Sequence, residues 1–199
     1  MTTIFIIRHG RFVNPNQIIP LRLPDYHLSG EGHEQIALVS AHLKGKNITK
    51  VFSSPVDRCL ETAEIISGDL GFTQVIVDQR LIELGSPYQG ITKGKFKEQF
   101  FDKCLYDDPL QKEKGETAEV VIARMQSFLD WVLDEYKDQA VVVVSHGDPI
   151  MLLEYALTGK DYCGLMEGVT TDYIPMSGHF EWQFEGNKLA KERRSWSDV

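Results

Sequence analysis

The chain has 199 residues, of which 42% are hydrophobic and 25% are charged. This length and composition fit one globular domain spanning residues 1–199, and they exclude intrinsic disorder, collagen and a small disulfide-stapled fold. The 21 Lys and Arg residues against 29 Asp and Glu give a net charge of −8. We therefore expect neither nucleic acid nor an anionic membrane as a partner, and an anionic ligand would need a local cluster of basic side chains.

The N-terminal segment MTTIFIIRHG is a short apolar run that no basic residues precede, and no part of the chain approaches the roughly 18 apolar residues of a membrane span. Three cysteines, Cys59, Cys104 and Cys163, form neither a CxxC pair nor an even set. Such cysteine usage favours a reducing compartment, so we expect a cytoplasmic protein. The sequence does not define an oligomeric state.

Residues 4–7, the first apolar run, are hydrophobic without alternation, which is typical of a strand buried on both faces. Ser29 is expected to cap the helix that follows, which ends near Gly45. Its buried face carries Ile36, Val39 and Leu43. A second strand is predicted at 48–52.

A second helix is predicted from Ser54, because proline follows at the first helical position and Asp57 stands three residues after the cap. A short run at 75–77 fits a further strand. Thr117 is expected to open a long helix, and residues 141–144 form another buried strand with a helix starting at Pro149.

Alternating aromatic residues at Phe180, Trp182 and Phe184, followed by the turn residues 186–187, predict a C-terminal hairpin with one solvated face. Strands that alternate with helices predict an α/β fold with a mainly parallel central sheet and helices on both faces. Residues 86–115 fit this pattern least, and we interpret them as an insertion or lid over the active face, with a helix around Phe96 and Phe100.

Two histidines and two arginines lie either directly after a strand-like segment or in the first turn of the helix that follows one. Arg8 and His9 follow the first run, and His146 follows the run at 141–144. Arg58 lies in the first helical turn after the second run. Ligands of an open α/β sheet bind outside the carboxyl ends of its strands, and guanidinium groups and helix N-termini bind phosphate. The sequence therefore predicts a phosphate-binding pocket.

A series of motifs along most of the chain carries a family resemblance. The motifs occur between residues 3 and 157, and they are Ile7-Arg8-His9-Gly10, residues 28–32 with 35–37, and residues 51–58, 61–63, 81–83, 115–117 and 144–147. In this order they resemble the histidine phosphatase superfamily, also called phosphoglycerate mutase-like proteins. The resemblance implies a phosphoglycerate mutase-like fold with a small insertion after Glu83.

The resemblance also implies roles for individual residues. His9 would become phosphorylated, and Arg8, Arg58 and His146 would hold the phosphoryl group. Glu83 would donate a proton to the leaving oxygen and later take one from water. His9 and His146 are thus catalytic candidates together with Glu83. We expect the flanking arginines to depress the pKa of His9 in the empty site. We expect no metal ion and no other cofactor, because guanidinium groups supply the positive charge and the remaining histidines lack metal-ligand spacing.

Departures from the family pattern favour a phosphatase over a mutase. Phe12 stands where a small hydroxyl residue is common, and the region after Glu83 is short for a mutase. Asn14 receives no role, and Arg11 either approaches the substrate or is solvated. We expect a metal-independent phosphatase that hydrolyses a small phosphorylated metabolite through a phosphohistidine. The alternatives are phosphoglycerate mutase-type transfer, or a catalytically silent module that binds a phosphorylated ligand.

Overall fold

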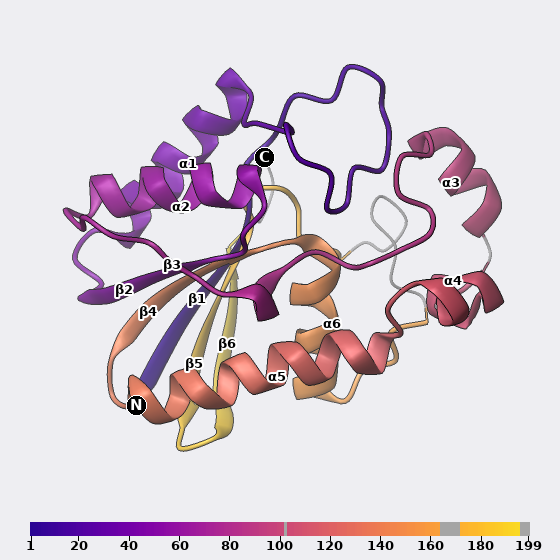
Figure 1. Ribbon diagram of the computed structural model, residues 1–199. Helices are drawn as coiled ribbons and strands as arrows, with labels where there is room; N and C mark the ends of the chain where they lie inside the picture. Colours follow the sequence, from indigo (N-terminus) through magenta and orange to yellow (C-terminus); the bar gives the residue numbers. More distant parts are fainter. Residues whose placement is uncertain (102, 164–171, 196–199) are drawn as a thin grey trace.

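The computed structural model describes residues 1–101, 103–163 and 172–195 (Figure 1). These residues form a six-stranded sheet in the order β3-β2-β4-β1-β5-β6. The strands are β1 (Thr2–Arg8), β2 (Ile48–Ser53), β3 (Ile76–Val77), β4 (Ala140–Ser145), β5 (His179–Glu185) and β6 (Lys188–Ser195). Strands β1 to β4 run parallel, β5 runs antiparallel to β1, and β6 antiparallel to β5. The prediction of a mainly parallel sheet is confirmed, and the C-terminal hairpin forms its antiparallel edge.

Helices cover both faces of the sheet, as predicted (Figure 1). On one face α1 (Gly30–Leu43) and α2 (Asp57–Asp69) pack on Phe5 and Ile7 of β1. On the other face α5 (Ala118–Glu135) and α6 (Gly147–Thr158) pack on Ile4 and Ile6. Each of these four side chains is at most 2% exposed, and burying one contributes about 1.5–3 kcal/mol. No described helix has the length and apolar character needed to cross a membrane.

Helix caps explain where several of these elements begin and end. The Ser29 side chain accepts from the backbone N–H of Gly32 at 3.1 Å and so caps α1, as its position in the sequence predicts. Gly45 follows the helix with a φ of +79°, a conformation that favours glycine. Thr117 likewise caps α5.

The predicted start of the second helix is wrong. Helix α2 begins at Asp57, and its N-cap residue, Val56, provides no side-chain cap. Ser54 instead extends the pairing of β2 with β4 by one residue, because its backbone N–H donates to the carbonyl oxygen of Val144 at 3.0 Å. The Ser54 hydroxyl lies 2.8 Å from His146 Nε2 and is therefore engaged in the site rather than in a helix cap.

Residues 86–115 lie next to the carboxyl end of the sheet and contain more structure than predicted. The expected helix is α3 (Lys93–Phe100), and a second one, α4 (Pro109–Lys114), follows it (Figure 1). Phe100 and Tyr106 are buried in the main core, Phe96 packs against it, and Phe101 is 68% exposed. The segment is thus anchored to the domain by its own apolar side chains.

Candidate active site

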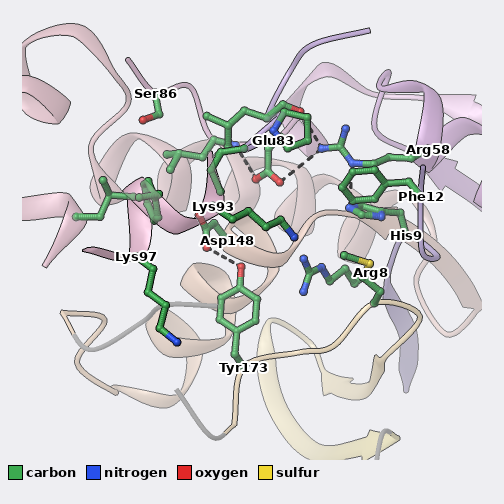
Figure 2. A pocket seen from close by; sticks show the side chains of 17 residues that line it. Arg8, His9, Phe12, Arg58, Glu83, Ser86, Lys93, Lys97, Asp148 and Tyr173 are labelled. Atoms are coloured by element: carbon green, nitrogen blue, oxygen red, sulfur yellow. Dashed lines mark hydrogen bonds and ion pairs between the residues drawn. The ribbon is translucent and has the colours of Figure 1, made fainter. Parts of the chain in front are cut away.

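The order of the sheet brings the three predicted strand ends together. Strands β2, β4 and β1 are neighbours, so Ser54, His146 and His9, which follow them, meet at one edge. A cavity of about 350 Å³ opens there, and Arg8, His9, Arg58 and Glu83 line it (Figure 2). His146 does not line the cavity; it is fully buried behind Arg58 and Glu83.

The imidazole of His9 is held in one tautomer. Its Nδ1 lies 2.9 Å from the carbonyl oxygen of Gly10, which only accepts hydrogen bonds, so Nδ1 carries the hydrogen. Nε2 therefore keeps its lone pair and accepts from Arg58 Nε at 3.0 Å. Burial holds the pKa of His9 well below its usual value, and the charges of Arg58 and Arg8 lower it further. The direction is the one expected from the sequence, but burial is a larger cause than the arginines.

Arg58 is the central cation of the site. It is 1% exposed, and its Nη2 donates to the carbonyl oxygen of Leu21 at 2.8 Å and to His146 Nδ1 at 3.0 Å. Its Nη1 is buried without a hydrogen-bond partner among the described residues. Leaving a buried charged donor unpaired is costly, so Nη1 is suited to an anion entering the cavity. The ring of Phe12 lies 5.2 Å from Arg58 Cζ and thus supports the guanidinium.

His146 connects the base of the site to β2. Since Nδ1 accepts from Arg58, Nε2 carries the hydrogen and donates to the Ser54 hydroxyl at 2.8 Å. Burial, followed by the charge of Arg58, lowers the pKa of His146 well below its usual value. Its contact of 3.5 Å with Glu83 Oε2 is therefore not a charged pair. Sequence reasoning missed the role of Ser54 because serine followed by proline is also a common helix start.

Glu83 projects into the cavity after a short 3-10 turn at Gln79–Leu81. Its Oε1 accepts from the backbone N–H of Leu84 at 2.8 Å, and its Oε2 lies 3.8 Å from Arg58 Nη2. Burial and the nearby charge of Asp148 raise the pKa of Glu83 to about 7, although Arg58 acts in the opposite direction. At neutral pH the carboxyl group is thus divided between its protonated and ionised forms, which suits a proton donor.

A network of ion pairs and hydrogen bonds, which no sequence pattern indicates, holds the backbone of Glu83 in place. Arg22 Nε and Arg124 Nη2 donate to the Glu83 carbonyl oxygen at 2.8 and 3.3 Å. Glu116 pairs with both arginines, at 2.5 Å from Arg22 Nη2 and 3.1 Å from Arg124 Nε. These residues come from three distant segments, so only the folded chain brings them together.

Residues of β1, α6 and the C-terminal segment also line the cavity. Arg8 Nη1 donates to the carbonyl oxygen of Ile174 at 2.9 Å, and Arg8 Cζ lies 5.4 Å from the Tyr173 ring. The Tyr173 hydroxyl donates to Asp148 Oδ1 at 2.7 Å (Figure 2). His146 is itself the N-cap residue of α6, which starts at Gly147, so Asp148 does not cap this helix.

Arg11 and Asn14, in the loop after β1, make contacts away from the cavity. Arg11 pairs with Glu31 at 3.2 Å on the surface, with 56% of its side chain exposed, and it does not line the cavity. The Asn14 side chain bonds both backbone groups of Ile18, at 2.8 and 3.1 Å, and so holds the loop.

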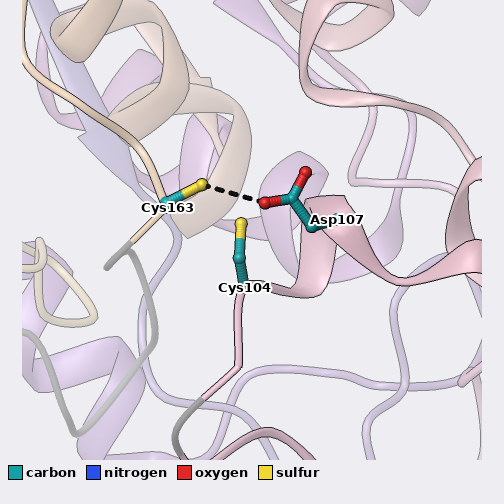
Figure 3. Close-up of side chains that lie close together, drawn as sticks. All are labelled: Cys104, Asp107 and Cys163. Carbon is teal, nitrogen blue, oxygen red and sulfur yellow. Dashed lines mark hydrogen bonds between the residues drawn. The ribbon is translucent and has the colours of Figure 1, made fainter.

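Two groups of described residues outside the cavity lining have ligand atoms close enough for a metal ion: Cys104, Asp107 and Cys163, and Asp25, His27 and Asp57. In the first group the Cys163 thiol donates to Asp107 Oδ2 at 3.4 Å, next to Cys104 (Figure 3). Lys112 Nζ, 2.9 Å from Asp107 Oδ1, already supplies a cation there. The spacing of Cys104 and Cys163 along the chain does not indicate this proximity.

Comparisons with known proteins agree with this arrangement. The sequence model of the histidine phosphatase superfamily (branch 1) matches residues 4–173. Phosphoserine phosphatase 1 of Hydrogenobacter thermophilus is 31% identical over 171 residues, covering 81% of this chain and 78% of its own. A 2,3-bisphosphoglycerate-dependent phosphoglycerate mutase of Thermoplasma acidophilum is 31% identical over 153 residues, covering 75% and 73%. The solved structure of Bacillus stearothermophilus YhfR has the same fold, with a TM-score of 0.82 at 21% identity, and the match covers 100% of this chain and 98% of that one.

Proposed function

The chain belongs to the histidine phosphatase superfamily, and on this basis we propose that it is a metal-independent phosphatase that hydrolyses small phosphomonoesters through a phosphohistidine on His9. The observation that carries the proposal is the pairing of His9 and Arg58. Nε2 of a neutral imidazole lies 3.0 Å from a buried guanidinium whose Nη1 has no partner among the described residues. A nucleophile and an anion-binding group thus face the same cavity.

In the first step, His9 Nε2 attacks the phosphorus atom in line with the leaving oxygen. A P–N bond forms while the P–O bond to the leaving group breaks, and Glu83 gives its proton to the departing oxygen. Arg8 and Arg58 neutralise the charge on the non-bridging oxygens, which is where preorganised cations contribute most. Their guanidinium groups supply the charge that a metal ion supplies in other phosphatases.

In the second step, water attacks the phosphohistidine. The ionised Glu83 takes a proton from the water as the new P–O bond forms and the P–N bond breaks, which releases phosphate and regenerates neutral His9. A pKa of about 7 suits both duties, because Glu83 must exist in both protonation states near neutral pH.

His146 supports the site from beneath. It reaches the cavity only through Arg58 and Glu83, so in the empty site we assign it the positioning of the Arg58 guanidinium. The ring centroids of His146 and His9 are 5.3 Å apart. Direct binding of the phosphoryl group by His146 stays a prediction.

A second candidate function is phosphoglycerate mutase-type transfer, in which the phosphoryl group of His9 passes to another hydroxyl group instead of water. The similarity to a curated phosphoglycerate mutase favours it. The phosphatase takes precedence because Phe12 fills the position of the small hydroxyl residue common in the family, and it packs on Arg58 and His9.

One assay series distinguishes the candidates. The purified protein and its His9→Ala variant are incubated with p-nitrophenyl phosphate, and separately with 3-phosphoglycerate. We expect phosphate release from the aryl ester by the intact protein only, together with an acid-labile phosphoryl-enzyme. Faster conversion of 3-phosphoglycerate to 2-phosphoglycerate than to free phosphate would establish the mutase. If the intact protein shows neither activity, or if the His9→Ala variant is as active as the intact protein, the proposal of an enzyme is wrong.

A further inference from the structure

We propose that Cys104, Asp107 and Cys163 form a binding site for one zinc ion, which holds the segment 86–115 to the chain that follows α6. The proposal goes beyond the phosphatase function, because the three residues lie outside the lining of the catalytic cavity. It leaves the metal-independent chemistry at His9 unchanged. The expectation of no metal ion rested on the catalytic arginines and on the spacing of the histidines, and neither concerns this cluster.

Local structure explains why Cys104 and Asp107 lie close together. Cys104 directly precedes the 3-10 turn Leu105–Asp107 and is its N-cap residue. The backbone N–H of Asp107 donates to the carbonyl oxygen of Cys104 at 3.2 Å, and side chains three positions apart in a 3-10 turn lie above one another. Two intervening residues are also a common spacing between ligands of structural zinc sites. This short turn thus supplies two of the three ligands.

A contact between two tyrosines brings the third ligand to this turn. The ring centroid of Tyr162 lies 5.7 Å from that of Tyr106, and the Tyr162 hydroxyl donates to Glu119 Oε1 at 2.7 Å, in the first turn of α5. Cys163, the next residue, is therefore held beside the turn, although 56 positions separate it from Asp107.

The distances among the ligand atoms suit a tetrahedral zinc ion. The Cys163 thiol lies 3.4 Å from Asp107 Oδ2, and the three ligand atoms of the cluster all lie within 4.8 Å of one another (Figure 3). With Zn–S bonds of about 2.3 Å and Zn–O bonds of about 2.1 Å, tetrahedral angles place sulfur and oxygen about 3.6 Å apart and two sulfurs about 3.8 Å apart. The ligand atoms therefore need to move by about 1 Å at most, and water supplies the fourth ligand.

The charges of the cluster balance when a divalent ion is bound. Zinc binds thiolates, so each cysteine releases its proton, and the two thiolates and the Asp107 carboxylate then carry three negative charges. Lys112 Nζ balances one of them at Oδ1 of Asp107, at 2.9 Å, and leaves Oδ2 facing the thiols. The divalent ion balances the other two. Thiolate ligands favour zinc over Mg²⁺ and Ca²⁺, which prefer oxygen.

The cluster is accessible, and an ion bound there would stabilise the fold. The Asp107 side chain is 65% exposed, and both cysteines are half-buried free thiols. An ion that joins segments far apart in the sequence closes a long loop, and the entropy cost of that closure is already met in the folded chain. Zinc is therefore expected to raise the Tm.

The test is a titration of the metal-free protein with Co²⁺ and then Zn²⁺, under a phosphine reductant that keeps the thiols reduced. A thiolate-to-cobalt charge-transfer band reports sulfur ligands, and we expect it to saturate at one equivalent per chain. Zn²⁺ should displace Co²⁺, remove the band and give the Kd for zinc. At a free zinc concentration about 100 times this Kd, the Tm should rise by about 5 °C or more.

Variants of the three ligands test the assignment. Cys104→Ser and Cys163→Ser should each weaken zinc binding by at least about 100-fold, because loss of a mere supporting residue already costs about 10–100-fold. Asp107→Asn, at an exposed position, should weaken it by about tenfold or more and tests the site even if a cysteine variant fails to fold. The matched controls are Cys59→Ala, which removes the remaining cysteine, and Glu113→Gln, which removes an exposed carboxylate of α4. Both should bind zinc as the intact protein does.

A band at one equivalent that the ligand variants lose and the controls keep would support the site. No band in the intact protein, or an undiminished band in Cys163→Ser, would overturn it. A reduced protein that binds no metal but forms a Cys104–Cys163 disulfide with oxidised glutathione would also overturn it and assign the pair to redox chemistry. These readouts measure metal binding, so the proposed phosphatase is tested separately, with p-nitrophenyl phosphate.

Discussion

Arg58 Nε donates a hydrogen bond to the lone pair of His9 Nε2, and the two nitrogen atoms are 3.0 Å apart. In the proposed mechanism, the guanidinium group that binds the anion therefore also covers the nucleophilic nitrogen until the anion enters. When a phosphoryl group enters, its oxygens compete for the guanidinium, and the lone pair of His9 becomes free to attack the phosphorus atom. On this proposal, binding of the anion and activation of the nucleophile occur together.

His9 is expected to stay neutral in the empty enzyme at mildly acidic pH. Burial and the charges of Arg58 and Arg8 disfavour the imidazolium, so the pKa of His9 should lie below the roughly 6.5 of an unperturbed histidine. A 15N or 13C NMR titration of labelled histidine, assigned with the His9→Ala variant, would measure it. A pKa at or above that of a model histidine would contradict this account.

The activity is expected to fall as the pH rises through about 7, because Glu83 then loses the proton that the leaving oxygen needs. Glu83→Gln should slow hydrolysis of an alkyl phosphate by about 10²–10⁴-fold. The loss should be smaller for p-nitrophenyl phosphate, whose leaving group needs little protonation. The measurement is kcat/KM against pH for both esters, and the same loss for both would argue against proton donation.

Arg58→Lys is expected to weaken binding of vanadate or phosphate by at least about tenfold. A lysine has a single ammonium group. The guanidinium of Arg58 has three nitrogens: Nε bonds His9, Nη2 bonds His146 and the carbonyl oxygen of Leu21, and Nη1 stays available for an anion in the cavity. The inhibition constant of vanadate measures the loss. Unchanged inhibition would show that the anion binds elsewhere.

His146 and Arg58 should be coupled in a double-mutant cycle. If His146 acts by holding the guanidinium, then His146→Gln in the Arg58→Met background should cost little more than Arg58→Met alone. The readout is kcat/KM for p-nitrophenyl phosphate. Additive losses would instead support direct contact between His146 and the phosphoryl group.

His179 is expected to make the fold sensitive to acid. It is buried in β5, its ring centroid lies 5.3 Å from that of His42, and burial followed by the charge of His42 lowers its pKa to about 4. Since the unfolded chain binds this proton near pH 6.5, the free energy of unfolding falls as the pH drops from about 6.5 to 4, by about 3 kcal/mol for this group.

Urea denaturation of the intact protein and of His179→Leu at several pH values would measure this contribution. The variant should lose less stability on acidification, and His33→Gln, at an exposed position, serves as the control. A variant with the same pH dependence as the intact protein would exclude His179 as the cause.

Much of the fold and the position of the site follow from local patterns. Continuous apolar runs such as residues 4–7 identify strands buried on both faces, and the polar residues that end them identify the edge where ligands bind. Other features depend on tertiary contacts. Arg22 meets Glu83 across 61 positions, and no local pattern specifies such a partner. The prediction that Ser54 caps a helix is wrong for a related reason, because its partner, His146, is 92 positions away.

The two outer strands of the sheet differ in how they are protected. At one border β3 has only two residues, Ile76–Val77, and at the other β6 carries Lys188, Lys191, Arg193 and Arg194 among its eight residues. Short and strongly charged borders discourage the addition of strands from other molecules. The parallel centre, whose strands β1 and β4 lead into His9 and His146, is thus protected at both edges from pairing with strands of other molecules.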